Sequence, residues 1–279
     1  MGNLFSFLGW GSRSGTNLNP KSRLPEPEPI LLESIIGGDD RVPVSDIGKE
    51  PWRKFVCLRI DYGGGIKALG TGVLIAPDMV LTAAHNLYSL KRRKFAKSIL
   101  AEVGVYEGQS KASARANRIE VCSTYTKHKP SDVKKYLSDY GVIRLADTSA
   151  YDWAKSLCDA ETLAPLSDVE LKTTLLNLAG YPNHGASRPP ILYRHDGGTI
   201  HSSIHEKLFS YEIDTLPGQS GAPVFAYDAA TKQMRLAGIH VAGGETANSA
   251  RRYNAAAQSD VKAWRKKLSK HKARDFVGV

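Results

Sequence analysis

Short apolar runs alternate with Gly, Pro and Asp turn residues from residue 42 to residue 258. Such runs, rich in Val, Ile, Leu and Ala and bounded by turn residues, are typical of β-strands. The clearest examples are FVCLRI (55–60), GTGVLIAP (70–77), ILAEVGVY (99–106), GVIRLA (141–146), TLLNLAGY (174–181), SYEIDT (210–215), APVFAYD (222–228) and RLAGIHVAGG (235–244). Many short strands in succession indicate an all-β sandwich or a pair of barrels.

The two ends of the chain depart from this pattern. From Ser259 onward, Val261, Trp264 and Leu268 recur at helical spacing with Lys and Arg between them, which predicts an amphipathic C-terminal helix. Residues 1–33 combine a Gly/Ser/Asn stretch with a Pro-Glu alternation, a composition that cannot form a core. We therefore expect four parts, which are a flexible pro-segment or linker (1–33), a first β-barrel (34–150), a second β-barrel (151–258), and a helix with a tail (259–279).

Composition limits the classes of partner. The chain has 279 residues, enough for two modest domains, and a net charge of +10. Neither interleaved aromatic and basic residues nor zinc-ligand spacing accompanies that charge, so no nucleic-acid partner is expected. The three cysteines, Cys57, Cys122 and Cys158, are too far apart for a metal motif, and neither a metal nor another cofactor is expected.

The first residues, MGNLFS, match the N-myristoylation pattern M-G-x-x-x-[ST], with Gly2 as the acceptor. The short apolar head lacks a preceding positive residue, so it is a poor secretory signal. We expect a cytoplasmic protein, or one weakly associated with membranes through Gly2 and a basic patch such as residues 91–97. Secretion by a non-standard route is the alternative.

Three motifs carry side chains suited to nucleophilic catalysis. LTAAHN places His85 after an apolar run, SDYGVIRL places Asp139 at the head of a strand, and LPGQSGAPVF places Ser220 between glycines. A serine hydroxyl needs a nearby base, and histidine can take and return a proton at neutral pH. A buried carboxylate then holds the histidine in the required tautomer. The motifs together therefore predict a Ser-His-Asp triad, although each one alone is more often structural.

Glycines around the serine add a second chemical feature. Gly218 and Gly221 allow a tight turn, so the backbone N–H groups of Gly218 and Ser220 can converge on a developing oxyanion. The separations of 54 residues (139 − 85) and 81 residues (220 − 139) suit two successive barrels.

With these motifs in the order His, Asp, Ser, the chain resembles the chymotrypsin-fold serine endopeptidases, and most closely their glutamyl endopeptidase (V8-like) branch. The similarity runs from about Ser34 to Gly244 through SIIGGDDR, AGYPNHG, DTLPGQSGAPVF and GIHVAGG. The resemblance implies two six-stranded antiparallel β-barrels, with His85 and Asp139 in the first and Ser220 in the second. It also implies hydrolysis of protein or peptide substrates through an acyl-enzyme, without a metal. We expect a monomer.

The same resemblance implies a pocket for an acidic side chain at P1, the substrate residue before the scissile bond. Thr215 and His240 would hold that carboxylate, and Val241 and Gly243 would pair with the extended substrate as an added strand. Asp214 argues the other way, because trypsin-like enzymes place a carboxylate six residues before the nucleophile to bind Arg or Lys. A protease with a different P1 preference and a catalytically silent peptide-binding protein therefore stay open as alternatives.

The segment LLESIIGGDDR resembles the activated start of a trypsin-like enzyme, yet no Lys or Arg precedes its isoleucines. In trypsin-like zymogens the freed amine reaches an Asp directly before the nucleophile, and here that position is the uncharged Gln219. We therefore expect a precursor cleaved between Glu33 and Ser34, the kind of bond that a Glu-specific enzyme cuts. In the resembling branch, the mature start lies near the P1 pocket.

Overall fold

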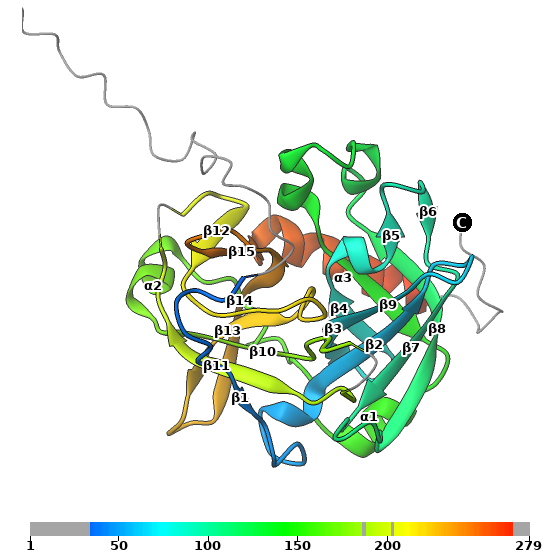
Figure 1. The fold of residues 1–279 in the computed structure, drawn as a ribbon, viewed down its shortest axis with the longest axis horizontal. Helices are drawn as coiled ribbons and strands as arrows, with labels where there is room; N and C mark the ends of the chain where they lie inside the picture. The colour runs from blue at the N-terminus through cyan, green and yellow to red at the C-terminus, as the bar shows by residue number, and fades with distance from the viewer. Residues whose placement is uncertain (1–33, 186–187, 202–203, 270–279) are drawn as a thin grey trace, which may run out of the picture.

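The computed structural model describes residues 34–185, 188–201 and 204–269, and two β-sheets organise them (Figure 1). The first sheet is a closed six-stranded antiparallel barrel. Its strands in spatial order are β2 (Phe55–Asp61), β3 (Lys67–Ala76), β4 (Met79–Thr82), β9 (Gly141–Leu145), β8 (Ala112–Val121) and β7 (Ser98–Val103). A separate small hairpin joins β5 (Tyr88–Ser89) to β6 (Lys94–Phe95).

The second sheet contains seven strands. Their spatial order is β1 (Val42–Pro43), β11 (Tyr193–Gly198), β10 (Leu176–Gly180), β13 (Pro223–Asp228), β14 (Gln233–Ala242), β15 (Asn248–Arg252) and β12 (Leu208–Tyr211). A bridge between Ile200, just after β11, and Tyr211 on β12 closes six of these strands into a second ring. The predicted double-barrel fold is confirmed, and the short β1 is an addition to its second half.

Successive side chains of β2 point to two different cores, which explains why so many strands are apolar on both faces. Val56, Leu58 and Ile60 point into the interior of the first barrel, whereas Phe55 and Cys57 join a core shared between the two barrels. The Phe55 ring packs edge-on against the Phe225 ring of β13, with 5.8 Å between ring centroids. Arg59 continues the Phe55–Cys57 face and is exposed where that shared core ends.

Three α-helices lie among the described residues, in addition to short 3₁₀ turns. They are α1 (Ser149–Ala154), α2 (Asp168–Thr173) and α3 (Ala255–Ser269). None of the described helices is both long and apolar enough to cross a membrane.

The C-terminal helix packs behind the first barrel next to β9 (Figure 1). It begins at Ala255 rather than at Ser259, because the side chain of Asn254 accepts the N–H of Ala257 at 3.0 Å and starts the helix earlier. Val261 and Leu268 are buried, which confirms the predicted apolar stripe.

Candidate active site

His85 and Asp139 meet at the edge of the first barrel. His85 lies in a 3₁₀ turn (Ala84–Asn86) that follows β4, and Asp139 follows another 3₁₀ turn (Val133–Ser138) just before β9. One carboxylate oxygen of Asp139 accepts the backbone N–H of His85 at 2.9 Å, and the other lies 2.8 Å from His85 Nδ1. The Asp139 side chain is 1% exposed and the imidazole 31% exposed. This two-point contact fixes the ring while its other face stays accessible.

The loop of residues 214–221, which we call the nucleophile loop, carries Ser220 between β12 and β13. Gly218 and Gly221 adopt φ values of +101° and +85°. A Cβ on Gly218 would lie 2.5 Å from the Tyr181 carbonyl oxygen, and one on Gly221 would lie 2.1 Å from Thr82 Oγ1. Only glycine fits either position, as the sequence pattern indicated.

Side chains of the first barrel hold the nucleophile loop in place. The Ser220 carbonyl accepts the Asn86 side-chain amide at 2.8 Å and the Thr71 N–H at 2.9 Å. Thr71 Oγ1 also donates to the Gly218 carbonyl at 2.9 Å. Because Asn86 directly follows His85, these bonds bring the loop and the histidine together across the two barrels. Sequence reasoning missed Asn86 and Thr71, although the position of Asn86 next to His85 was a usable signal.

His240 lies at the other side of the nucleophile loop. Its carbonyl accepts the N–H of Gly221 at 2.9 Å, so β14 runs directly beside Ser220. The imidazole is fully buried, and its Nδ1 lies 2.6 Å from the Tyr211 hydroxyl. The sequence did not point to Tyr211 as a partner of His240, because the two residues are 29 positions apart.

Thr215 is also fully buried, and its hydroxyl oxygen has no hydrogen-bond partner among the described residues. A buried hydroxyl without a partner is costly, so it is suited to an incoming acceptor. The Thr215 N–H donates to the Ser34 carbonyl, which also accepts the Asn248 side-chain amide, both at 2.9 Å. Asn248 pairs with Tyr211 across β12 and β15, so these residues connect Thr215 to His240.

Val241 and Gly243 continue the strand beyond His240. The pairing of β14 with β13 ends at Ile239, whereas its pairing with β15 continues to Ala242. Within the described chain, Ala242 is therefore paired on one side only, with Ser249 of β15, and the side of Val241 and Gly243 towards β13 is open to an added strand.

Asp214 turns its carboxylate towards the residues near Ser34 rather than serving as a receptor for cations. Its two oxygens accept the backbone N–H groups of Ile36 at 2.7 Å and of Asp40 at 2.9 Å, and the residue is 1% exposed. The interpretation of Asp214 as the carboxylate that binds a positively charged P1 side chain therefore loses its support.

Arg41 makes the last contact between this segment and the nucleophile loop. Its guanidinium donates to both oxygens of Asp39, at 2.9 and 2.8 Å, and to Gln219 Oε1 at 3.0 Å. The hydrogen bond from Arg41 is the main reason that the pKa of Asp39 lies below its ordinary value. Gln219 Oε1 also accepts the N–H of Leu216 at 3.0 Å. The uncharged Gln219 side chain cannot form an ion pair with a freed amine, but it accepts a hydrogen bond from the buried guanidinium of Arg41.

Two sequence-based expectations concern residues that the structure does not describe. Gly2 and Glu33 lie outside the described residues, whereas Ser34 is buried and its N–H lies 3.3 Å from Asn248 Oδ1. Across the described ranges, no three His, Cys, Asp or Glu side chains come together in a way that could hold a metal ion.

Comparison with known proteins places this geometry in context. Residues 70–231 match the family described as the trypsin-like peptidase domain. A glutamyl endopeptidase of Bacillus licheniformis is 27% identical over 79% of this chain, which spans 63% of that relative's length. A protein of Bacillus subtilis named as an extracellular metalloprotease is 28% identical over 83% of this chain and 69% of its own length. A solved structure of a Glu endopeptidase in complex with MPD covers 83% of this chain and 99% of its own, with a TM-score of 0.66 and 23% identity, which supports the fold.

Proposed function

Because the chain belongs to the trypsin-like peptidase domain family, we propose that it is a serine endopeptidase with His85, Asp139 and Ser220 as its catalytic triad. The observation that carries this proposal is the two-point contact of Asp139 with His85, made across 54 residues of sequence. The hydrogen bonds from Asn86 and Thr71 to the Ser220 carbonyl support this proposal, since they hold the loop of Ser220 next to the turn that carries His85.

The reaction proceeds through an acyl-enzyme. Ser220 Oγ attacks the carbonyl carbon of the scissile bond and its proton passes to His85, whose positive charge Asp139 stabilises. The N–H groups of Gly218 and Ser220 stabilise the oxyanion. The imidazolium then protonates the leaving amine. Water, deprotonated by the same imidazole, attacks the acyl carbon, and the imidazolium returns that proton to Ser220 Oγ as the acyl group is released. Every proton moves through His85, so the ring must keep the orientation that Asp139 sets.

We propose further that the enzyme prefers Glu or Asp at P1. Thr215 has a buried hydroxyl ready to donate, and His240 is held by Tyr211 beside the nucleophile loop. A substrate carboxylate placed there would receive charge-assisted or neutral hydrogen bonds in a site shielded from water. The use of both Asp214 oxygens by backbone N–H groups removes the main argument for a basic P1 residue.

Peptides that differ only at P1 test this specificity. We expect kcat/KM for Glu to exceed that for Phe or Arg, and His240→Val to lower the rate for Glu by about 10–100-fold, the value of one hydrogen bond to a charged group. Labelling of Ser220 by a fluorophosphonate should persist in His240→Val. Fastest cleavage after Arg would contradict an acidic P1 site, and an unlabelled wild-type protein would favour the silent peptide-binding alternative.

Intact masses of the wild type and of Ser220→Ala test the expected processing. We propose that the enzyme cuts its own precursor between Glu33 and Ser34, so the wild type should lose residues 1–33 and Ser220→Ala should keep them. Support comes from the position of the Ser34 N–H beside Asn248 Oδ1, which can also accept a freed amine. The mass of Ser220→Ala, which should keep Gly2, also reports whether that residue carries myristate. Identical N-termini in both proteins would refute self-cleavage.

A further inference from the structure

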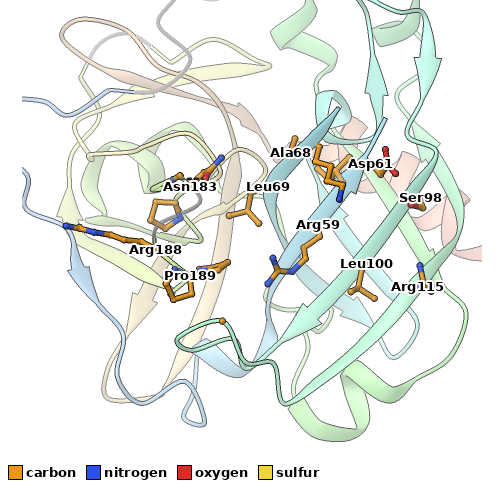
Figure 2. A pocket seen from close by; sticks show the side chains of 16 residues that line it. Arg59, Asp61, Ala68, Leu69, Ser98, Leu100, Arg115, Asn183, Arg188 and Pro189 are labelled. Atoms are coloured by element: carbon orange, nitrogen blue, oxygen red, sulfur yellow. Dashed lines mark hydrogen bonds between the residues drawn. The ribbon is translucent and has the colours of Figure 1, made fainter. Parts of the chain in front are cut away.

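A groove of about 630 Å³ runs along the outer face of the first barrel (Figure 2). Strands β2, β3, β7 and β8 form one wall, and residues near Asn183 and Pro189 form the other. Figure 2 shows Leu69, Arg59 and Leu100 on the barrel wall, with Asn183 and Pro189 across from them. None of the catalytic or P1-pocket residues described above lines this groove.

One end of the groove meets the nucleophile loop. Leu69 lies two residues before Thr71, which binds both Gly218 and Ser220. On the opposite wall, the N–H of Asn183 donates to the Pro217 carbonyl at 2.5 Å. The strand that would pair with the acyl part of a substrate lies beyond His240, on the other side of Ser220. An extended chain that crosses Ser220 from that strand therefore leaves towards Leu69 and Asn183, into the groove.

Strand register arranges the groove wall into rows of side chains. Arg59 on β2 is paired with Leu69 on β3 and with Leu100 on β7, and Leu100 is paired with Arg115 on β8. Residues paired across neighbouring strands point to the same face and lie about 5 Å apart. Apolar and basic side chains therefore alternate along this row. A second row on the same face places Lys67 opposite Asp61.

The groove lining carries more basic than acidic side chains, with Arg59, Lys67, Arg115 and Arg188 against Asp61. Arg59 is bonded to Glu102, and the Asp61 carboxylate accepts the Gly63 N–H at 2.6 Å. Lys67 and Arg115 are exposed and make no ion pair with the described residues. Arg188, although it lines the groove, extends its side chain away from it (Figure 2).

We propose that this groove binds the part of the substrate that follows the scissile bond and selects acidic side chains there. Lys67 and Arg115 attract the carboxylates, while Leu69 and Leu100 contact the aliphatic parts of the peptide. The inference rests on the proposed endopeptidase function and extends it, since it makes acidic segments, rather than single acidic residues, the preferred cleavage sites.

The test compares two fluorogenic peptides that share Glu at P1 and carry either Asp and Glu or Ser and Gln at the second to fourth positions after the scissile bond. We expect a 5–10-fold higher kcat/KM for the acidic peptide through a lower KM, because each exposed ion pair contributes modestly and salt screens it. The advantage should shrink in 0.5 M NaCl. Lys67→Glu/Arg115→Glu should abolish or invert it.

Lys172→Glu/Lys232→Glu is the matched control, since it makes the same charge change at exposed residues outside the groove. Equal loss of the acidic preference in both double variants would mean that net charge alone acts, and an unchanged preference in Lys67→Glu/Arg115→Glu would also overturn the proposal. Cleavage of the neutral peptide reports the endopeptidase function separately. If neither peptide is cleaved, fluorescence anisotropy of the same peptides with Ser220→Ala decides on the groove, and equal affinity for both would refute it.

Discussion

Asp139→Asn is expected to lower kcat by about 10⁴-fold while leaving KM nearly unchanged. One Asp139 oxygen accepts the backbone N–H of His85, so the asparagine oxygen must take that place. The asparagine NH₂ group then faces Nδ1 and donates to it, which leaves the proton of a neutral ring on Nε2. Such a ring cannot accept the proton of Ser220. Steady-state kinetics on a peptide with Glu at P1 provides the measurement.

A matched control for this substitution exists on the surface. His128 and Asp132 form a similar pair, with 2.7 Å between Nδ1 and the carboxylate, but they lie outside the candidate site. Asp132→Asn should keep full activity, and Ser220→Ala should define the floor. Thermal melts show whether Asp139→Asn is folded. A folded Asp139→Asn enzyme with kcat within tenfold of the wild type would exclude Asp139 from the triad.

Arg41→Met is expected to lower kcat by about 100-fold and to reduce the fraction of molecules that a fluorophosphonate labels. The substitution removes a buried, charged hydrogen bond to Gln219, which corresponds to about 1.5–3 kcal/mol. Gln219 directly precedes Ser220 and also holds the N–H of Leu216, so its release loosens the turn that aims the oxyanion donors. The kcat of Arg41→Lys should lie between those of the wild type and Arg41→Met, since an ammonium lacks the planar guanidinium that contacts Asp39 and Gln219 together.

Arg235→Met serves as the control, because Arg235 pairs with Glu170 at the surface, where ion pairs contribute little. The fraction of molecules labelled at Ser220 by a fluorophosphonate, measured at a low temperature where both proteins are folded, separates an effect on positioning from an effect on stability. If Arg41→Met melts at a lower temperature but retains the wild-type kcat and full labelling while folded, Arg41 only stabilises the fold and does not position the nucleophile.

These contacts connect Ser34–Arg41 to the nucleophile loop at three places. Ser34 bonds to Thr215, the N–H groups of Ile36 and Asp40 bond to Asp214, and Arg41 bonds to Gln219. In a trypsin-like zymogen, a freed amine supplies the positive charge that orders this loop. Here the Arg41 guanidinium contacts Gln219, the corresponding residue, so we expect the loop to be ordered without a free amine at that place.

Local patterns were sufficient for the fold class, and they indicated the residues of the candidate site. A strand buried on both faces must be apolar almost throughout, so runs such as 55–60 and 70–77 were visible without any structure. Glycine at Gly218 and Gly221 follows from backbone angles that other residues avoid, so the motif around Ser220 indicated its own geometry. The helical spacing of Val261 and Leu268 likewise predicted α3.

Strands with exposed or polar side chains gave much weaker signals. Strand β8 (ASARANRIEV) and strand β15 (NSARR) belong to the two sheets, yet they contain few large apolar residues. Backbone hydrogen bonds to their neighbours stabilise them, and those bonds leave no trace in side-chain composition.

Only the tertiary structure decided which distant polar groups meet. Arg41 and Gln219 are 178 residues apart, and Ile36 and Asp214 are equally distant, so no local pattern could show that each is the other's partner. The position of Asp214, six residues before Ser220, suggested that it binds a basic P1 side chain. In the structure its two oxygens instead accept backbone N–H groups of Ile36 and Asp40. The row of alternating apolar and basic side chains in the groove likewise exists only through strand register, which places Arg59 and Arg115 on one face. The sequence by itself determined the barrels and the residue types of the candidate site, because these follow from local burial and backbone angles. Which buried polar groups become partners depends instead on packing between the barrels.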